Sequence, residues 1–285
     1  MSDLFFEIQH LTHCYADGTK ALKDLSLKIS KGKKIALLGN NGAGKSTLFQ
    51  HLNGILQPTS GKILFQGKPL KYNRKSLLEL RSHVGIVFQD PDSQLFAGNV
   101  RQDISFGPLN LNWSPEKVTE MVEWAMSEIE VTPLQDKPIH FLSLGQKKRV
   151  AIAGVLAMNP DVFILDEPSA GLDGYYSKQI LNLLNKIQQL DKTIILSTHD
   201  VHFAYEWADE IIVMNDGEII YHGDPFHIFE QEELLLKAHL DKPWLFEMSQ
   251  LLQAKNIIKG LNEFPRNKDE LINYLKTSIP IETII

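Results

Sequence analysis

One segment near the N-terminus has the residue types and the spacing that bind a nucleoside triphosphate. Residues 39–47 read Gly39-Asn40-Asn41-Gly42-Ala43-Gly44-Lys45-Ser46-Thr47, a complete phosphate-binding P-loop. An apolar run precedes this loop as a buried strand would, and a helical pattern follows it. In such a loop, backbone N–H groups surround the β-phosphate, the lysine reaches the β- and γ-phosphates, and the hydroxyl after it binds Mg²⁺. We therefore expect Lys45 to contact the phosphates and Ser46 to bind Mg²⁺.

Two adjacent carboxylates follow an apolar strand later in the chain. Residues 162–165 are uniformly apolar, and Asp166 and Glu167 come directly after them. Because ligands of parallel sheets bind at the carboxyl ends of the strands, both acids are expected to face the phosphates. Asp166 suits the Mg²⁺ shell, and Glu167 suits a base that orients or deprotonates the attacking water. Two acids at a strand end also occur in solvated turns and helix caps, but the P-loop favours the catalytic interpretation.

Three single polar residues are further candidates. His199 follows an apolar strand and is expected at the γ-phosphate. Gln89 ends another strand, where its amide would complete the shell of Mg²⁺ or of the attacking water. Tyr15 lies in the loop after the first strand, and its ring can stack on a base. Other interpretations stay open. Tyr15 could serve only loop packing, His199 could have a structural role, and His199 and His202 could form a metal-binding pair.

The elements around these residues are typical of an α/β protein. Strand patterns in the first part of the chain occupy residues 4–11, 25–29, 62–66 and 84–88. The stretch near residues 98–158 is mainly helical, and its strongest helices are expected at 115–130 and 143–157. Further strands are expected at 162–165, 193–197, 211–214 and 218–221, with a helix at 177–190 between them. This alternation favours a mainly parallel sheet with helices on both faces.

Composition and charge restrict the class of protein. The 285 residues suit one large domain, alone or with a small extension. A net charge of −6 argues against a general nucleic-acid-binding surface, so no nucleic-acid partner is expected. The single cysteine, Cys14, excludes an internal disulfide and fits a reducing cytosol. No apolar stretch is long enough for a membrane span and no signal peptide is evident, so membrane contact would require a partner.

A second motif links these features to a known family. Residues 141–150 read Phe141-Leu142-Ser143-Leu144-Gly145-Gln146-Lys147-Lys148-Arg149-Val150. Together with the P-loop, Gln89, Asp166-Glu167, residues 170–173 and His199, they resemble the ATP-binding-cassette (ABC) ATPases over residues 1–240. The resemblance implies a nucleotide-binding domain with a mainly parallel core sheet, an antiparallel β subdomain and a helical subdomain at about residues 90–160. Residues 241–285 would form a small helical extension.

The resemblance also implies roles for the candidate residues. ATP would be bound by Tyr15 and the whole P-loop, and Mg²⁺ by Ser46, Gln89 and Asp166. Glu167 would be the catalytic base and His199 the switch, with Gln89 assisting. The signature residues would contact the nucleotide held by a second ABC ATPase, most simply an identical copy in a head-to-tail dimer; they are Leu142, Ser143, Leu144, Gly145 and Gln146.

The signature departs from the usual sequence Leu-Ser-Gly-Gly-Gln. Leu144 stands where the first glycine is expected. A side chain there restricts a positive φ and the close approach of another backbone. We therefore expect a working site with altered energetics of closure. A second departure is Gly174, which stands where proline is common.

Other segments resemble the energy-coupling-factor importers. They are residues 87–96, 100–108 and 149–157. Within this group, a bulky residue before Gly145, followed by Gln146-Lys147-Lys148-Arg149, is similar to the sequence of the cobalt-type ATPase. This branch implies a peripheral subunit on the cytoplasmic face of the cell membrane, partnered by a transmembrane coupling subunit and a small substrate-binding membrane subunit. Leu95 and Phe96 are expected as exposed apolar contacts for the coupling subunit. The expected substrate is cobalt or nickel, with vitamins as the main alternative.

Three other classes of protein were weighed. A soluble ABC protein acting on nucleic acid or ribosomes usually has two cassettes or a long coiled-coil insertion, whereas this chain has one P-loop and a negative charge. A P-loop kinase or GTPase is disfavoured by the signature segment, and the guanine-binding motif Asn-Lys-x-Asp does not occur. An ABC exporter ATPase is the nearest of these rivals.

The C-terminal segment contains apolar residues at helical spacing, which are consistent with either core packing or a dimer contact: Trp244, Leu245, Met248, Leu251 and Leu252.

Overall fold

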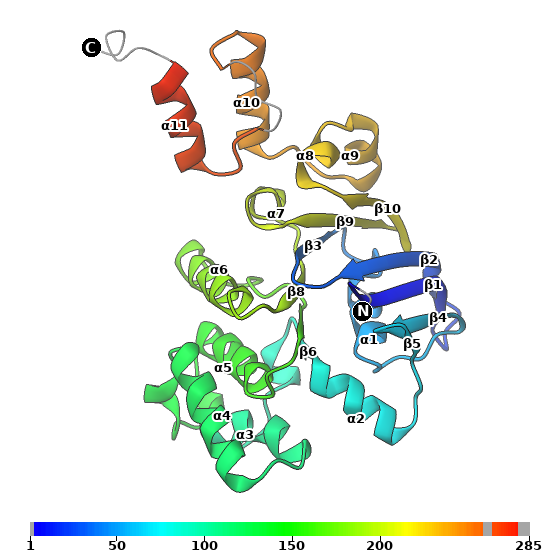
Figure 1. Ribbon diagram of the computed structural model, residues 1–285, viewed down its shortest axis with the longest axis vertical. Helices are drawn as coiled ribbons and strands as arrows, with labels where there is room; N and C mark the ends of the chain where they lie inside the picture. The colour runs from blue at the N-terminus through cyan, green and yellow to red at the C-terminus, as the bar shows by residue number, and fades with distance from the viewer. Residues whose placement is uncertain (1–2, 259–263, 279–285) are drawn as a thin grey trace.

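The computed structural model describes residues 3–258 and 264–278. A central sheet of six strands runs through the middle of the molecule (Figure 1). Its strand order is β10 (Glu218–Gly223), β9 (Glu210–Asn215), β3 (Lys34–Leu38), β8 (Thr193–Ser197), β7 (Val162–Leu165) and β6 (Val84–Val87). The five strands from β9 to β6 are parallel, and only β10 pairs in the antiparallel direction. The mainly parallel core sheet expected from the sequence is therefore present.

The strand order brings four loops together. Strands β3, β8, β7 and β6 are consecutive neighbours in the sheet. Each is almost entirely buried, as the uninterrupted apolar sequences predicted. Because the carboxyl ends of parallel strands share one edge, the loops after these strands lie side by side. The sheet thus positions the P-loop, the carboxylate pair, and the segments of Gln89 and His199.

A second sheet holds the helix that follows the P-loop. It is antiparallel, with the order β2 (Lys20–Ser30), β1 (Leu4–Cys14), β4 (Ser60–Phe65) and β5 (Lys68–Pro69). Its long strands extend several residues beyond the sequence-based boundaries. Its inner face shares a hydrophobic core with α1 (Lys45–Leu52), in which Phe6 and Phe49 are fully buried. This packing fixes the start of α1 relative to the core sheet.

Three helices form a separate group on the side of the molecule away from the antiparallel sheet (Figure 1). They are α3 (Val100–Asn110), α4 (Pro115–Glu128) and α5 (Leu144–Leu156), with short 3₁₀ turns at Thr132–Leu134 and Ile139–Phe141. Ser114 caps α4 and accepts a hydrogen bond from the backbone N–H of Lys117. The expectation that Leu95 is exposed is wrong, because its side chain packs into the core beside these helices and is only 7% exposed.

Other helices flank the core sheet. Helix α6 (Gly174–Gln188) begins earlier than predicted because the Asp173 side chain caps it, accepting from the backbone N–H of Tyr176. Helix α7 (Val201–Trp207) follows β8, and α2 (Arg74–His83) precedes β6. The sequence analysis did not anticipate α2, because Leu80 is its only buried residue and its apolar periodicity is weak.

The C-terminal part contains α8 (Pro225–Phe229), α9 (Glu232–Ala238), α10 (Trp244–Ala254) and α11 (Lys268–Ser278). Helix α10 packs through Leu245 and Phe246, and the Phe246 ring contacts Phe226 and Phe264. Three of the apolar residues named in the sequence analysis do not pack into the core and are 42–60% exposed: Trp244, Met248 and Leu251. None of the helices in the described residues has the length and apolar character to span a membrane.

Candidate active site

The P-loop has a backbone that glycine alone permits at two positions. Gly39 and Gly44 have φ values of +148° and +100°. A side chain at Gly39 would collide with the carbonyl oxygen of Met214, and one at Gly44 would lie 2.7 Å from the carbonyl oxygen of Ala21. Between these glycines the loop is partly exposed, and the N-terminus of α1 begins at Lys45. The chain thus forms a tight cradle of the kind that binds phosphate groups.

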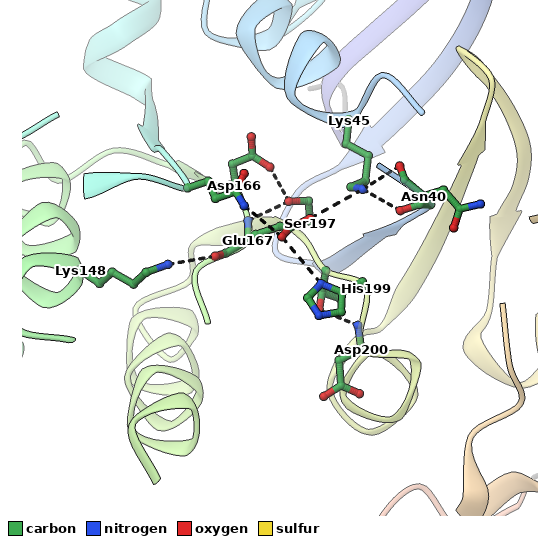
Figure 2. Close-up of polar contacts among 11 residues, drawn as sticks. Asn40, Lys45, Lys148, Asp166, Glu167, Ser197, His199 and Asp200 are labelled. Atoms are coloured by element: carbon green, nitrogen blue, oxygen red, sulfur yellow. Dashed lines mark hydrogen bonds and ion pairs between the residues drawn. The ribbon is translucent and has the colours of Figure 1, made fainter. Parts of the chain in front are cut away.

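Lys45 is buried at the base of this cradle. Its Nζ donates hydrogen bonds to the carbonyl oxygens of Gly39, at 2.6 Å, and Asn40, at 3.2 Å. The same atom lies 3.8 Å from Oε1 of Glu167 (Figure 2). Burial lowers the pKa of Lys45, and the negative charges of Glu167 and Asp166 oppose part of this shift. The lysine therefore connects the phosphate cradle with the carboxylate pair.

Asp166 is held by a residue that the sequence analysis missed. The hydroxyl of Ser197, the last residue of β8, donates to Oδ1 of Asp166 at 2.6 Å. The same Oγ accepts a 2.8 Å hydrogen bond from the backbone N–H of Glu167 (Figure 2). Ser197 is fully buried. The sequence offered one signal for this role, the position of Ser197 at the end of a strand. Its proximity to Asp166 could not be predicted, because it depends on β8 and β7 being neighbours in the sheet.

Glu167 is at the centre of the polar cluster. Its side chain accepts from Nε2 of Gln89 at 3.3 Å, and its Oε2 lies 3.7 Å from Nδ1 of His199. Its backbone φ is +44°, an unusual conformation for a residue with a side chain, which costs about 1–3 kcal/mol and is common at functional sites. The structure therefore brings Lys45, Gln89, Glu167 and His199 together, as the sequence analysis expected.

The residues assigned to Mg²⁺ have suitable donor groups. Ser46 is exposed at the start of α1, Gln89 is exposed after β6, and the buried Asp166 presents its carboxylate at the end of β7. A hydroxyl, an amide and a carboxylate supply the oxygen ligands that Mg²⁺ prefers. They fit a Mg²⁺ ion bound together with a nucleotide, since this ion usually takes few protein ligands. Within the described residues, no group of three or more His, Cys, Asp or Glu side chains could hold a metal by itself.

Tyr15 is anchored beside the P-loop helix. Its hydroxyl is 3.0 Å from Oγ1 of Thr47. Its ring packs edge-on against His13, which packs edge-on against His51; both pairs of ring centroids are 4.7 Å apart. Nδ1 of the buried His51 hydrogen-bonds the carbonyl oxygen of Thr47 at 2.8 Å, and burial is the largest cause of its lowered pKa. The Tyr15 ring is 39% exposed at the edge of the loop.

The signature residues form the start of α5. Ser143 and Gln146 make a capping box, in which each side chain hydrogen-bonds the backbone N–H of the other residue. Leu142 is buried and Leu144 is 40% exposed. Neither Leu144 nor Gly145 has a positive φ, so the left-handed conformation considered in the sequence analysis is not required here. The Leu144 side chain instead packs over Gly171.

The two histidines near α7 have different surroundings. His199 is 74% exposed and faces Glu167. Nδ1 of His202 accepts a hydrogen bond from the backbone N–H of Trp244, so this residue contacts the C-terminal helices. The two residues therefore do not form the metal pair that was weighed as an alternative, which agrees with the absence of a larger ligand group in the described part of the chain.

Comparison with known proteins identifies the class of this site. The family model described as "ABC transporter" matches residues 22–170. The EcfA energy-coupling factor transporter ATP-binding protein of Methanocaldococcus jannaschii is 46% identical over 95% of this chain and 98% of its own length. A putative ABC transporter ATP-binding protein of Methanosarcina mazei is 46% identical over 96% of this chain, which spans only 60% of that relative.

Solved structures agree with this result. The cbiO1 protein of Clostridium perfringens, described as part of the ABC transporter complex cbiONQ, has a TM-score of 0.74 and 45% identity, covering 87% of this chain and all of that one. A dimeric ATP-binding cassette bound to ADP and Pi has a TM-score of 0.71 and 26% identity, covering 77% of this chain and 98% of that one. The chain belongs to the ABC transporter family. It is an ABC-type ATPase, and its nucleotide and ion are ATP and Mg²⁺.

Proposed function

We propose that this chain is the ATP-hydrolysing subunit of an energy-coupling-factor importer and that it supplies the energy for uptake of a transition-metal ion. The observation that supports hydrolysis most directly is the placement of Glu167, whose carboxylate lies beside both Lys45 and Gln89. Similarity to the M. jannaschii EcfA protein and to the C. perfringens cbiO1 protein supports the importer assignment.

We assign the catalytic roles as the sequence analysis expected. Residues 39–47 bind the phosphates and Tyr15 stacks on adenine. Glu167 acts as the general base, while Gln89 orients the attacking water and His199 contacts the γ-phosphate. Such a base typically contributes about 10²- to 10⁴-fold in rate. Bound Mg²⁺ would neutralise developing negative charge on the phosphates, with Ser46, Gln89 and Asp166 around it.

The signature implies a second copy of the ATPase. The N-terminus of α5 carries a partial positive charge, which suits a γ-phosphate. We propose a head-to-tail dimer in which residues 142–146 of one chain approach the ATP bound by the other. The dimeric cassette with ADP and Pi among the similar structures supports the formation of a dimer. An identical second chain is the simplest form of it.

A cavity beside α3 suits a membrane partner. It has a volume of about 820 Å³ and lies between α2, α3 and α5. Four exposed apolar side chains lie at this cavity: Leu78, Phe96, Phe106 and Leu109. The rings of Phe96 and Phe106 pack edge-on with their centroids 4.7 Å apart. We propose that cytoplasmic helices of the transmembrane coupling subunit bind here and hold the chain at the cytoplasmic face of the membrane. A small membrane subunit would bind the substrate.

The proposed substrate is cobalt or nickel, and a vitamin is the alternative. The support is the bulky signature residue Leu144 and the similarity to cbiO1 of the cbiONQ complex. The direct test is uptake of radioactive Co²⁺ and Ni²⁺ by cells with and without this chain. Loss of metal uptake with retained vitamin uptake is expected, and the reverse result would support the vitamin importer.

A further inference from the structure

Lys148 is a buried cation that the assigned chemistry does not use. It lies in the second turn of α5, and only 3% of its surface is exposed. Its Nζ donates a 3.2 Å hydrogen bond to the backbone carbonyl oxygen of Glu167 (Figure 2). Burial of an ammonium group is unfavourable unless the group has compensating partners. Because burial of the Lys148 ammonium group costs free energy, its contact with Glu167 is expected to serve a purpose.

The surroundings of Lys148 connect it electrostatically to the same site. Burial is the main effect on its pKa and lowers it, while the negative charges of Glu167 and Asp90 act in the opposite direction. Asp90 directly follows Gln89 in the chain. The ammonium group of Lys148 therefore faces both segments that bring side chains to the proposed attacking water.

The backbone of Glu167 is held from three directions. Its N–H donates to Ser197 at the end of β8, and its carbonyl oxygen accepts from the N–H of Ala170 at 3.0 Å. The third contact is the bond from Lys148, which comes from the helical group. Because Glu167 has a strained φ of +44°, its conformation depends on such surrounding contacts. Loss of one contact would allow the carboxylate to move relative to Lys45.

Helix α5 connects this contact to the signature. The helix begins at the capping box of Ser143 and Gln146, which is only a few residues before Lys148. The adjacent Lys147 forms an ion pair with Asp92 at 2.5 Å, in the 3₁₀ turn Pro91–Ser93 that follows Gln89. One rigid helix therefore carries the signature at its N-terminus and contacts the segments of both Gln89 and Glu167.

We propose that Lys148 is a positioning residue for ATP hydrolysis, which holds the Glu167 backbone and makes the placement of its carboxylate depend on helix α5. The inference rests on the proposed role of Glu167 as general base and on the proposed dimer. When the signature of this chain closes on the nucleotide of a second copy, α5 moves with it. The hydrogen bond from Lys148 then transmits this movement to Glu167, the proposed general base in the same chain.

A matched pair of buried lysines allows a controlled test. Lys192 is also buried, its pKa is also lowered mainly by burial, and its Nζ donates a 2.8 Å hydrogen bond to Oδ1 of Asn159, outside the active site. The variants are Lys148→Met, Lys148→Arg and Lys192→Met in the complete chain, purified with the membrane subunits that accompany it. The measurements are kcat for phosphate release and the equilibrium affinity for ATP.

The proposal predicts that Lys148→Met lowers kcat about 10- to 100-fold with unchanged ATP affinity, as expected for a small displacement of a catalytic group. Lys148→Arg keeps a donor and restores part of the activity, and Lys192→Met retains the kcat of the unmodified chain. In a chain with Glu167→Gln, the added Lys148→Met change has no further effect, because Lys148 acts through Glu167. If Lys148→Met cannot bind ATP, Lys148→Gln takes its place in the same comparison.

Two results would overturn the inference. The first is a normal kcat for Lys148→Met while Glu167→Gln is inactive. This result would refute the role of Lys148 but would leave the assignment of Glu167 as the base unaffected. The second is an equal proportional loss from Lys148→Met with and without Glu167→Gln, which would indicate a general structural role. Full activity of Glu167→Gln alone would instead refute the base assignment, and this inference with it.

Discussion

The Nζ atom of Lys45 lies 3.8 Å from Oε1 of Glu167, and both groups are largely buried. One group comes from the helix that follows β3, and the other from the loop that follows β7. Because β8 separates these strands in the sheet, their loops meet across its carboxyl edge. The lysine proposed to bind phosphate and the carboxylate proposed to activate water therefore lie close enough to interact electrostatically.

Removal of the Glu167 charge tests its role as the base. We expect Glu167→Gln to reduce the rate of ATP hydrolysis by about 10²- to 10⁴-fold, because the amide cannot accept the proton of the attacking water. ATP binding is expected to remain, since the P-loop is unchanged. Phosphate release and ATP affinity are measured side by side. The exposed Glu206→Gln serves as control, and normal turnover by Glu167→Gln would show that another group is the base.

The unusual signature residue can be restored to glycine. Leu144 is the first residue of α5, where no positive φ is needed, and its side chain packs over Gly171. We expect Leu144→Gly to keep the ATPase rate within about one order of magnitude and to lower stability by about 0.5–1 kcal/mol. Leu144→Ala separates the loss of packing from the added backbone freedom. Complete loss of turnover would show that Leu144 is required for closure.

The buried His51 makes stability depend on pH. Its pKa is lowered in the folded chain mainly by burial, whereas in the unfolded chain it is near 6.5. Below about pH 6.5 the unfolded state therefore binds the proton more readily, and stability falls as the pH decreases toward the folded pKa. The slope is at most about 1.4 kcal/mol per pH unit.

Urea unfolding between pH 7.5 and 5 measures this effect. His51→Gln is expected to flatten the dependence, because glutamine keeps a donor for the Thr47 carbonyl oxygen without titrating. Replacement of the exposed His140 by glutamine is the control. If His51→Gln has the same pH profile as the unmodified chain, His51 is not the source of the dependence.

A charge at the proposed docking cavity tests the membrane contact. Phe96 is 65% exposed, so Phe96→Glu is expected to abolish copurification of the coupling subunit while ATP binding is retained. The buried Leu95 is unsuitable for this test, because a charge there would damage the core. Leu236→Glu, at a 75% exposed position on α9, provides the control. Undiminished recovery of the membrane subunit with Phe96→Glu would place the contact elsewhere.

Residues in continuous motifs could be predicted from the sequence. The P-loop and the pair Asp166-Glu167 each lie directly beside an apolar strand, so local sequence predicted their position at the edge of the core sheet. The roles of Ser197 and Lys148 could not be predicted in this way. Their contacts with Glu167 depend on the order of strands and on the packing of α5, which join residues far apart in the sequence.

Burial was harder to predict than the identity of the elements. Leu95 and Phe96 are adjacent and similar in hydrophobicity, yet Leu95 lies in the core and Phe96 is mostly exposed. The irregular segment before α3 has no periodicity that distinguishes its two sides. In α10 three apolar residues follow one another, Trp244, Leu245 and Phe246, and tertiary packing buries the last two and leaves Trp244 outside.

The most direct test of the account is affinity purification of this chain from detergent-solubilised membranes of its native cell, followed by mass spectrometry. We expect one transmembrane coupling subunit, a small membrane protein of the cobalt or nickel type, and no second, distinct ABC ATPase. Recovery of a distinct second ATPase with several vitamin-binding subunits would contradict the metal assignment. Recovery of no integral membrane protein would contradict the importer function itself.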